Sequence, residues 1–241
     1  MEDLSASWPA KQKILVILAH PDDPEFFCGA SLARWARAGH EINYVLLTCG
    51  DKGRNDHNRH IPGEELCALR HREQRAASDV LGVHEIRFLD REDGYLVADL
   101  ALRRDVTREI RRFKPDVLVT CDPQNLFAIY GLNHPDHRAA GQVVLDAVFP
   151  AAGNELFFPE LLAEGFEPHS PKEVWASLTM QPNAALDVTD LWETKIRALE
   201  AHQSQIGDPA KLAERIRSRH TEDSTPENPR YEERFRVVKW R

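Results

Sequence analysis

Two short segments of this 241-residue chain concentrate histidines and carboxylates. Residues 20–25 read HPDDPE, and residues 134–137 read HPDH. Together they offer three imidazoles and several carboxylates, which are ligands that a zinc-type ion binds. An ion that performs chemistry rather than holding a fold together needs three protein ligands and one open position for water. The two segments therefore predict a metal-dependent hydrolase, provided that the fold brings them together.

The first segment follows an apolar run and contains two prolines. A strand end followed by proline restricts the backbone, so neighbouring side chains can reach one point. His20 and one aspartate can share an ion, and the spacing leaves open whether Asp22 or Asp23 is that ligand. The structural alternative is that one of these aspartates caps the helix that follows.

The second segment places His134 and His137 three residues apart. At the start of a helix this spacing puts both side chains on one side, so one can bind metal while the other acts as an acid. Asp136 could cap the helix or orient a histidine. A lone histidine is more often structural, but two histidines flanking Pro-Asp after a predicted strand favour a functional interpretation.

The length and composition are those of a soluble globular protein. We expect a single α/β domain over residues 1–241, because this length can bury one sizeable core. The sequence is 42% hydrophobic and 29% charged. It contains no apolar run of the ~18–20 residues that a membrane span needs. Residues 1–13 contain no apolar core of a signal peptide, so we expect a cytoplasmic location.

The net charge indicates which partners are expected, and the cysteines indicate the redox conditions in which the protein is expected to occur. A net charge of -8 argues against nucleic acid as a partner, because nucleic-acid binders usually carry a basic surface. The four cysteines are scattered and form no CxxC pair. We expect them to be small buried thiols in a reducing compartment. They are Cys28, Cys49, Cys67 and Cys121.

The first 120 residues alternate between strand-like and helix-like patterns. Expected strands span residues 14–19, 41–48, 85–89 and 116–120, and expected helices span residues 26–38, 64–81 and 100–113. This alternation predicts an α/β fold with a mainly parallel sheet and helices on both faces. Ligands bind at the carboxyl ends of the strands in such sheets, which is where both histidine segments lie.

The pattern is weaker after residue 150. Residues 174–178 and 185–188 resemble strands, and residues 191–202 and 209–219 resemble helices. The tail over residues 220–241 is polar and contains proline until residues 235–238, which read FRVV. No second domain is needed, and we expect the C-terminal part, about residues 150–241, to help shape the pocket.

Several ordered motifs together resemble the LmbE-like or PIG-L family of zinc-dependent N-deacetylases. Beside the two histidine segments they are TCGDKG at 48–53, RHRE at 70–73, DG at 93–94 and AHQSQ at 201–205. The resemblance covers most of the chain. It implies a Rossmann-like three-layer α/β/α sandwich and the removal of the acetyl group from N-acetylglucosamine-containing compounds, or the cleavage of related amides.

The resemblance also implies roles for individual residues. His20, Asp23 and His137 would bind Zn²⁺, with another divalent metal such as Fe²⁺ as the alternative. Asp22 would be the general base, and a charged His134 would stabilise the oxyanion from the opposite side. Whether Asp22 or His134 delivers a proton to the leaving amine stays open.

Three further residues are expected to bind substrate. Arg70 lies in the R-x-x-E motif, with an ion pair to Glu73 as the structural alternative. Asp93 could contact the sugar or serve only as a turn residue before Gly94. Asn133 is a candidate because this chain has leucine where some family members have an oxyanion-binding tyrosine.

That leucine is Leu132, and the nearest tyrosine, Tyr130, lies four positions before His134. His202, in the AHQSQ motif, would help shape the pocket, with a structural role as the alternative. Whether Tyr130, Asn133 or His202 assists catalysis stays open.

Other functions remain as alternatives. An amidase acting on a related thiol or sugar conjugate would use the same residues. Phosphoester hydrolysis usually needs two metals or a phosphate-binding glycine loop, and residues 20–29 lack that loop. A non-enzymatic, metal-stabilised binding module would close its metal with four protein ligands. The expected partner is a small amino-sugar conjugate, and by analogy the protein is expected to be a homo-oligomer.

Overall fold

The structure is a computed structural model that describes residues 1–128 and 131–239. Its main sheet has the strand order β3-β2-β1-β4-β7-β9-β8. Strands β3 to β7 in this order are parallel, and β9 is antiparallel to both of its neighbours. The strands are β1 (Lys13–Leu18), β2 (Glu41–Thr48), β3 (Glu85–Arg91), β4 (Val117–Cys121), β7 (Glu173–Ser177), β8 (Ala184–Asp187) and β9 (Glu232–Lys239).

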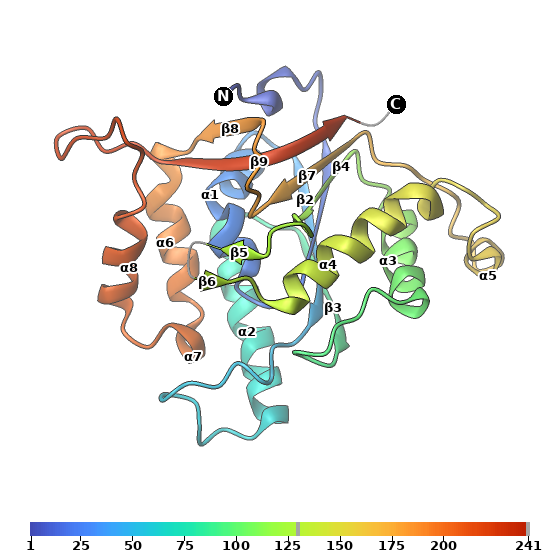
Figure 1. The fold of residues 1–241 in the computed structure, drawn as a ribbon, viewed down its shortest axis with the longest axis horizontal. Coiled ribbons are helices and arrows are strands. Elements are labelled where there is room, and N and C mark those ends of the chain that lie inside the picture. Colours follow the sequence, from blue (N-terminus) through green and yellow to red (C-terminus); the bar gives the residue numbers. More distant parts are fainter. Residues whose placement is uncertain (129–130, 240–241) are drawn as a thin grey trace.

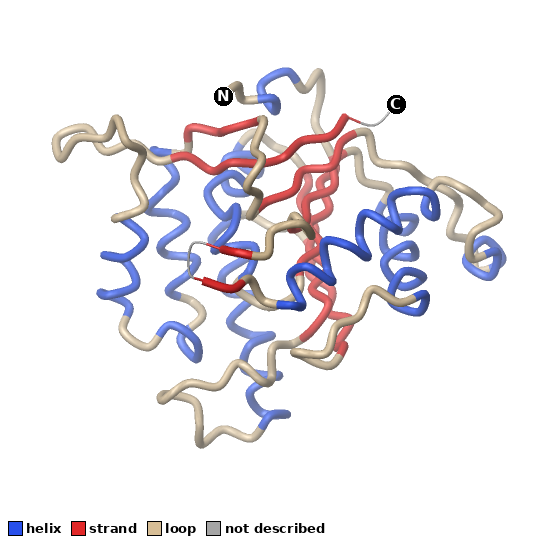
Figure 2. The backbone as a smooth tube through the Cα atoms, in the orientation of Figure 1, coloured by secondary structure: helices blue, strands red, loops and turns tan. Residues whose placement is uncertain are grey.

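Helices cover both faces of this sheet, as Figures 1 and 2 show. One face carries α1 (Asp23–Arg37), α2 (Gly63–Leu81), α6 (Trp192–Glu200) and α8 (Pro209–Arg217). The other carries α3 (Leu100–Phe113) and α4 (Pro135–Asp146). Shorter elements are η1 (Leu4–Ser7), β5 (Phe127–Ala128), β6 (Gly131–Leu132), η2 (Ala147–Ala152), α5 (Pro159–Ala163), η3 (Thr189–Leu191) and α7 (Gln203–Ile206). The predicted three-layer α/β/α sandwich is confirmed.

Residues 14–18 of strand β1 are all apolar because they are buried on both faces of the sheet. Ile14, Val16 and Leu18 pack into the core under α1 and α6. Leu15 and Ile17 pack into the core under α3 and α4. Because both faces of a central parallel strand are covered, every position must be apolar rather than every second one. Each such side chain contributes about 1.5–3 kcal/mol by leaving water.

The order of the strands creates a crevice at the end of β1. The chain proceeds from β1 outward to β2 and β3, then returns to form β4 on the opposite side of β1. Ile14 is therefore paired with Ile42 on one side and with Val117 on the other. Binding sites form at such a switch point, outside the carboxyl ends of the two diverging strands. Residues 20–25 follow β1 directly, and residues 134–137 follow β4 through the short β5–β6 hairpin.

The C-terminal strand β9 was not predicted, because the expected polar tail is instead an internal strand between β7 and β8. Its burial alternates: Glu233, Phe235 and Val237 face the core, while the residues between them are exposed. This period of two indicates a strand. Glu233, the first residue of β9 that faces the core, is charged, and this charge makes the segment resemble a solvent-exposed tail.

Two cysteines also differ from the expectation. Cys28 and Cys121 are free and buried, as predicted. Cys49 and Cys67 form a disulfide, so the prediction of separate thiols is wrong for this pair. The end of β2 lies beside α2, and the two Cα atoms are 5.1 Å apart. Residues 18 positions apart in the sequence cannot be paired from spacing alone.

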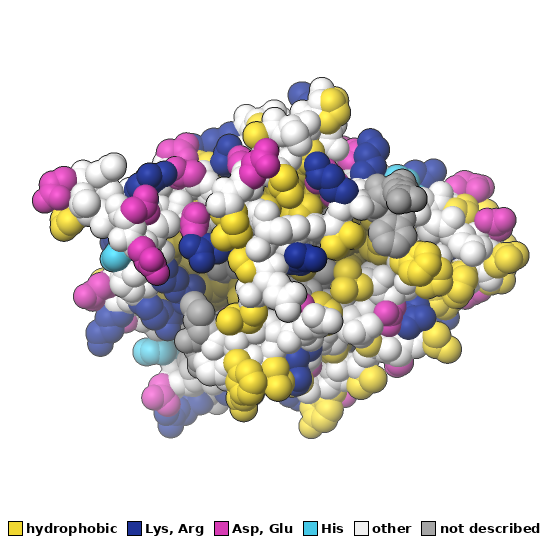
Figure 3. Space-filling model, turned by 45° about the horizontal axis from the view of Figure 1, so that its top comes forward, with side chains coloured by type: hydrophobic (Ala, Val, Ile, Leu, Met, Phe, Trp, Pro, Cys, Tyr) yellow, Lys and Arg dark blue, Asp and Glu magenta, His cyan; other side chains and the backbone are white. Residues whose placement is uncertain are grey.

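The side-chain types on the surface and the apolar character of the helices are relevant to the expected partners. Figure 3 shows acidic, basic and hydrophobic side chains interspersed over one face of the molecule. Over residues 1–128 and 131–239, no helix has both the length and the apolar character required to cross a lipid bilayer.

A buried ion pair attaches β9 to the helices on one face. Lys195 Nζ donates to Glu233 Oε1 at 2.5 Å and to the carbonyl of Phe26 at 2.9 Å. The Glu233 carboxylate also accepts from the backbone nitrogens of Ala30 and Ser31. Both charged side chains are 3% exposed. Because every partner is inside the protein, this pair joins β9, α6 and α1.

We predict that Glu233→Gln lowers the free energy of unfolding by about 3–5 kcal/mol, because it leaves the Lys195 ammonium buried without a counter-charge. Urea denaturation would measure the change. The control is Glu193→Gln, which breaks an exposed pair with Arg217 and should cost at most about 1 kcal/mol. Equal losses in the two variants would contradict this role for Glu233.

Candidate metal centre and active site

Three side chains with possible metal-binding atoms converge at the ends of β1 and β4. Asp23 Oδ1 lies 3.0 Å from His137 Nε2, and Asp23 Oδ2 lies 3.4 Å from His20 Nδ1. All three residues are buried. Asp23 therefore contacts both imidazoles. Donor atoms of a tetrahedral zinc site, with bonds of about 2.0–2.1 Å, lie about 3.3 Å apart. In the described residues, the groups here whose ligand atoms all lie within 4.8 Å of one another are His20 with His134 and His137, and His20 with Asp93 and Asp136. The ligand set His20, Asp23 and His137 stays a prediction.

The second nitrogen of each imidazole faces an oxygen acceptor. His20 Nε2 lies 3.2 Å from Asp93 Oδ1 and 3.4 Å from Asp136 Oδ2. His137 Nδ1 lies 2.9 Å from the amide oxygen of Asn133. A metal-binding histidine generally donates its other nitrogen to a carboxylate or a carbonyl, which fixes its tautomer and orientation. Both histidines have the surroundings that a metal ligand requires.

The charges around His20 also favour a bound cation. Burial lowers the pKa of His20, but Asp23, Asp136 and Asp93 outweigh that effect and raise it well above the usual value. Burial raises the pKa of Asp23, but His137 and His20 hold it far below its usual value. The pKa of Asp93 falls to about 2 although its burial acts in the opposite direction, chiefly because of His20. Three ionised carboxylates around one imidazole leave an excess of negative charge, which a divalent ion would neutralise.

Asp22 occupies a strained position beside these donors. Its φ is 86°, in the left-handed region, and its side chain forms no capping hydrogen bond to α1. Its backbone nitrogen donates to Gln74 Oε1 at 2.8 Å, and its Oδ2 accepts from Arg70 Nη2 at 3.0 Å. The helix-cap alternative is therefore wrong for Asp22. Non-glycine residues in this conformation persist where surrounding contacts enforce it, often at functional sites.

Burial raises the pKa of the Asp22 carboxyl, although the positive charges of Arg70 and His202 oppose this effect. Asp22 also lines the cavity described below. A carboxylate with a raised pKa that faces a cavity is suited to accept a proton.

Arg70 connects Asp22 to the loop after β2. Its Nη2 also donates to the carbonyl of Pro21 at 2.5 Å, and its Nη1 donates to the carbonyl of Gly50 at 2.8 Å. The alternative of an ion pair with Glu73 is wrong, because the Glu73 carboxylate accepts from the backbone nitrogen and the hydroxyl of Ser204. Arg70 is buried and orients Asp22 directly.

His134 has one nitrogen engaged by the backbone, and its expected role as a charged group that stabilises the oxyanion stays a prediction. Its Nδ1 accepts from the backbone nitrogen of Asp136 at 3.2 Å, so its hydrogen is on Nε2. Burial lowers the pKa of His134, and the nearby His20 and His137 lower it further. The ring is half-buried, lies edge-on to His20 with centroids 4.7 Å apart, and faces the cavity.

Asp136 has the orienting role that the sequence left as one of two alternatives. Its carboxylate accepts from the backbone nitrogens of Gly94 and Leu96, and it faces His20 Nε2. It thereby joins the start of α4 to the loop after β3. Asp93, in that loop, is also fixed, because its Oδ2 accepts from the backbone nitrogen of Lys52 at 2.9 Å.

Two further candidates are engaged within the protein. Asn133 is 3% exposed, contacts His137 and donates from Nδ2 to the carbonyl of Asn125 at 2.8 Å. His202 is fully buried, with its Nε2 3.2 Å from Glu25 Oε2. Glu25 also accepts from Gln74, the residue that holds the backbone of Asp22. Tyr130 lies outside the described residues.

A cavity of about 500 Å³ opens over these groups, which is a size typical of small-molecule sites. Its charged and polar side chains come from the ends of several strands, and apolar side chains form part of its wall. The lining comprises His20, Asp22, Asp23, Phe26, Phe27, Lys52, Gly53, Arg70, Asp93, Gly94, Leu132, His134, His137, Leu178, Gln205, Arg215 and Arg219. Four of these residues lie after residue 150.

Comparison with known proteins identifies one family. Residues 15–148 match the family PIG-L, described as GlcNAc-PI de-N-acetylase. The diacetylchitobiose deacetylase of Thermococcus kodakarensis is 34% identical over 195 residues, which cover 81% of this chain and 70% of that protein. A probable N-acetyl-alpha-D-glucosaminyl L-malate deacetylase 2 of Bacillus anthracis is 26% identical over 199 residues, or 81% of this chain and 82% of that one.

A solved structure matches the whole fold. The N,N'-diacetylchitobiose deacetylase from Pyrococcus horikoshii, in complex with an inhibitor, superimposes with a TM-score of 0.87 and 30% sequence identity. The match covers 98% of this chain and 87% of that chain. It therefore extends over the part of the chain after residue 148, where the family match ends.

We predict that zinc binds at His20, Asp23 and His137 and stabilises the folded protein. At a free Zn²⁺ concentration about 100 times Kd, the expected gain is about 2.7 kcal/mol, or a rise in Tm of about 5–10 °C. Thermal unfolding of the chelator-treated protein, without reductant, would measure it.

The rise in Tm should be lost in Asp23→Asn, because this substitution removes the carboxylate between the two imidazoles. It should be retained in Asp79→Asn, an exposed position on α2. An unchanged zinc effect in Asp23→Asn would exclude this carboxylate as a ligand.

Proposed function

The chain belongs to the PIG-L family of de-N-acetylases, and we propose that it is a zinc-dependent hydrolase that removes the N-acetyl group from an N-acetylglucosamine-containing conjugate. One observation carries the proposal: Asp22 lines a cavity of about 500 Å³ together with His20, Asp23 and His137, whose side chains contact one another and include possible metal-binding atoms. A base beside such a cluster is the arrangement that amide hydrolysis by water requires.

His20, Asp23 and His137 are the proposed ligands of the ion. The set of two imidazoles and one carboxylate is typical of catalytic zinc sites, and Fe²⁺ is the alternative metal. When bound, the ion would activate a water molecule and polarise the amide carbonyl. Asp93, Asp136 and the other oxygen acceptors orient the two imidazoles.

Asp22 is the proposed general base. Its carboxylate oxygen takes the proton of the attacking water, while Arg70 holds the carboxylate and Gln74 holds its backbone. A rigid base has its proton-accepting oxygen in place before the reaction, which reduces the entropic barrier. The strained backbone at Asp22 is consistent with such enforced placement.

His134 is the proposed donor to the amide oxygen. Because its Nδ1 is occupied by a backbone N–H, its Nε2–H can donate to the oxygen as negative charge develops there. A neutral imidazole can stabilise that charge without transferring a proton. The Asp22 carboxyl then holds the water's proton, so we assign the protonation of the leaving amine to Asp22.

The substrate class follows from the cavity and the relatives. Arg70 and Asp93 remain candidates for contacts to sugar hydroxyls, because both line the cavity. Asn133 remains a candidate, although its described contacts are within the protein. Arg215 and Arg219 also line the cavity, and their guanidinium groups could bind a negatively charged group attached to the sugar.

One relative is named as a deacetylase of diacetylchitobiose, and another as a probable deacetylase of N-acetyl-alpha-D-glucosaminyl L-malate. An amidase activity on a related thiol or sugar conjugate is the nearest alternative. A cytoplasmic location, homo-oligomeric assembly and a single domain are further parts of the proposal. A binding module without activity would be indicated by the absence of acetate release.

We predict that the zinc-loaded protein releases acetate from at least one N-acetylated amino-sugar conjugate in a panel containing neutral disaccharides and anionic conjugates. Asp22→Asn should reduce the rate about 10²–10⁴-fold, because it removes the proton acceptor while leaving the metal ligands. Mass spectrometry of product and metal analysis of the variant would measure both. Acetate release that survives chelation, or survives Asp22→Asn with metal bound, would exclude this mechanism.

We also predict that Arg70→Gln shifts the acidic limb of kcat/KM to higher pH. Activity needs ionised Asp22 and falls as pH drops through its pKa, which burial raises and Arg70 lowers. Removing the guanidinium therefore raises this pKa further. Arg70→Lys keeps a positive charge and should shift the limb less. Identical pH profiles for the wild type and Arg70→Gln would assign the acidic limb to another group.

A further inference from the structure

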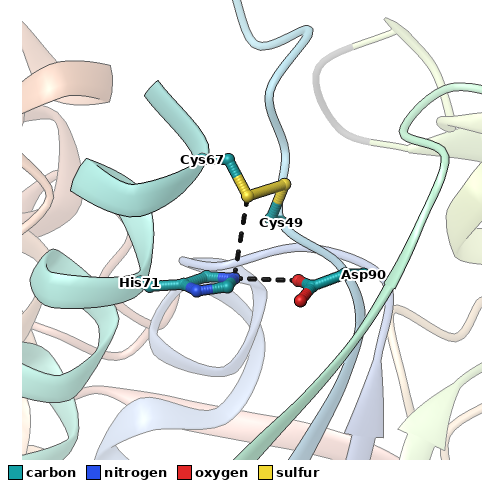
Figure 4. A group of neighbouring side chains, drawn as sticks. All are labelled: Cys49, Cys67, His71 and Asp90. Atoms are coloured by element: carbon teal, nitrogen blue, oxygen red, sulfur yellow. Dashed lines mark hydrogen bonds and ion pairs between the residues drawn. A yellow bond between two sulfur atoms is a disulfide. The ribbon is translucent and has the colours of Figure 1, made fainter. Parts of the chain in front are cut away.

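A second group of metal-binding side chains lies outside the cavity described above. Cys49, Cys67, His71 and Asp90 each offer one ligand atom, and these atoms all lie within 4.8 Å of one another. Figure 4 shows the His71 imidazole beside the two sulfurs and the carboxylate, with both marked contacts meeting at one nitrogen. None of these residues is used in the proposed deacetylation.

The four side chains come from three elements through distinct local features. Cys49 follows β2 directly, whereas Cys67 and His71 are four residues apart on α2 and so share one face. Asp90 lies in β3 with a left-handed φ of 48°, and the register of β2 with β3 shifts at this point. A bulge of this kind redirects a side chain, which here turns the Asp90 carboxylate toward the helix.

His71 is held in a position suited to a ligand. Its Nε2 lies 3.0 Å from Asp90 Oδ1 and 3.9 Å from Cys67 Sγ. Its ring stacks on Phe88, with centroids 3.7 Å apart and an interplanar angle of 23°. A disulfide alone needs neither an imidazole nor a carboxylate beside it. The oriented histidine and the redirected aspartate are explained if the group binds an ion.

The donor types indicate which ion. Two thiolates, one imidazole and one carboxylate would surround a borderline cation with four protein ligands, as structural zinc sites do. A surface hollow beside the group is lined by Asp51, Glu64 and Glu92 as well as by Asp90. These carboxylates favour the approach of a cation and provide a route from solvent.

We propose that, in the dithiol state, Cys49, Cys67, His71 and Asp90 form a second, structural binding site for a divalent cation of the Zn²⁺ type. The disulfide is the alternative state of the same two sulfurs. A dithiol reductant donates two electrons and two protons, which convert the S–S bond into two thiols while the reductant forms its own disulfide. The cation then displaces the two thiol protons, and these leave to solvent.

This site would hold the loop after β2 against α2. Gly50 follows Cys49, and its carbonyl accepts from Arg70, which lies three residues after Cys67 on the helix. The cation and the disulfide would each keep this loop beside Arg70. The proposed role of the second site is therefore to position the loop after β2 and not to bind substrate.

Cobalt binding tests the proposal directly. The full chain is reduced with a phosphine, its four thiols are verified by titration in denaturant, and the folded protein is titrated with Co²⁺. The expected result is a near-ultraviolet thiolate-to-cobalt charge-transfer band that saturates at one ion per chain. The band should be absent from the disulfide form. It should persist in Asp23→Asn, because the first site contains no sulfur ligand, and failure of the proposed deacetylation would leave it unchanged.

Substitutions distinguish a specific four-ligand site from adventitious binding of Co²⁺ to the thiols alone. Cys67→Ser should abolish most of the band, and His71→Phe or Asp90→Asn should weaken Co²⁺ binding at least ~10-fold. The control His60→Gln, an exposed histidine, should leave binding unchanged. A reduced, folded wild type with no charge-transfer band would overturn the proposal. A band unaffected by both His71→Phe and Asp90→Asn would also overturn it.

If Cys67→Ser does not fold, alkylation of the reduced wild type provides the second measurement. Zn²⁺ should protect Cys67 from iodoacetamide, as read by peptide mass spectrometry, with the buried Cys28 and Cys121 as internal references. Equal alkylation of Cys67 with and without Zn²⁺ would contradict the site.

Discussion

The carboxylate of Asp23 is a buried charge between two imidazoles that reach it from opposite sides of the sheet's switch point. An unpaired carboxylate in such an interior would cost several kcal/mol. His20 lies three residues before Asp23 and contacts Oδ2 through its backbone nitrogen and its ring, whereas His137 reaches Oδ1 from α4. The contact with Oδ1 therefore forms when these distant segments meet. The same constraint recurs at His20, where Asp93 and Asp136 add negative charge that a bound cation would balance. The fold around the site is organised to hold this excess of carboxylates in place.

Much of the surrounding structure serves to fix groups that touch these carboxylates. Asp136 binds backbone nitrogens of the loop after β3, and Arg70 binds carbonyls at the ends of β1 and β2. Gln74 and Glu25 continue the network to His202, which is fully buried. Because each polar group has a partner in a different element, a shift of one element breaks contacts in others. This interdependence explains how Asp22 can be kept in a left-handed conformation.

The sequence predicts the features that depend on local pattern. The bounds of β2 and α3 match the predicted ranges 41–48 and 100–113, because hydrophobic periodicity and capping are local signals. The pairing of the two histidine segments also follows from strand-end placement. Partners set by tertiary contact could not be predicted: β9 carries an inward Glu233 whose charge is compensated by Lys195 of α6 and by two backbone nitrogens of α1. Likewise, the engagement of His134 Nδ1 depends on a backbone contact at the start of α4, and the Cys49–Cys67 bond depends on where α2 lies beside β2.

The site divides between groups that perform chemistry and groups that select a substrate. The proposed ligands and the base lie within a few residues of strand ends or at the start of α4, where the sheet fixes the backbone. The groups facing the outer cavity come instead from the β5–β6 hairpin and from the region of α8, with Leu132 and Arg215 exposed. Helix α8 packs on one face of the sheet, and β5 and β6 form a separate two-stranded sheet, so their sequence can change with little effect on the proposed metal ligands. A family built in this way can keep one hydrolytic reaction while the sugar conjugate changes, which accounts for relatives with different substrates that share this fold.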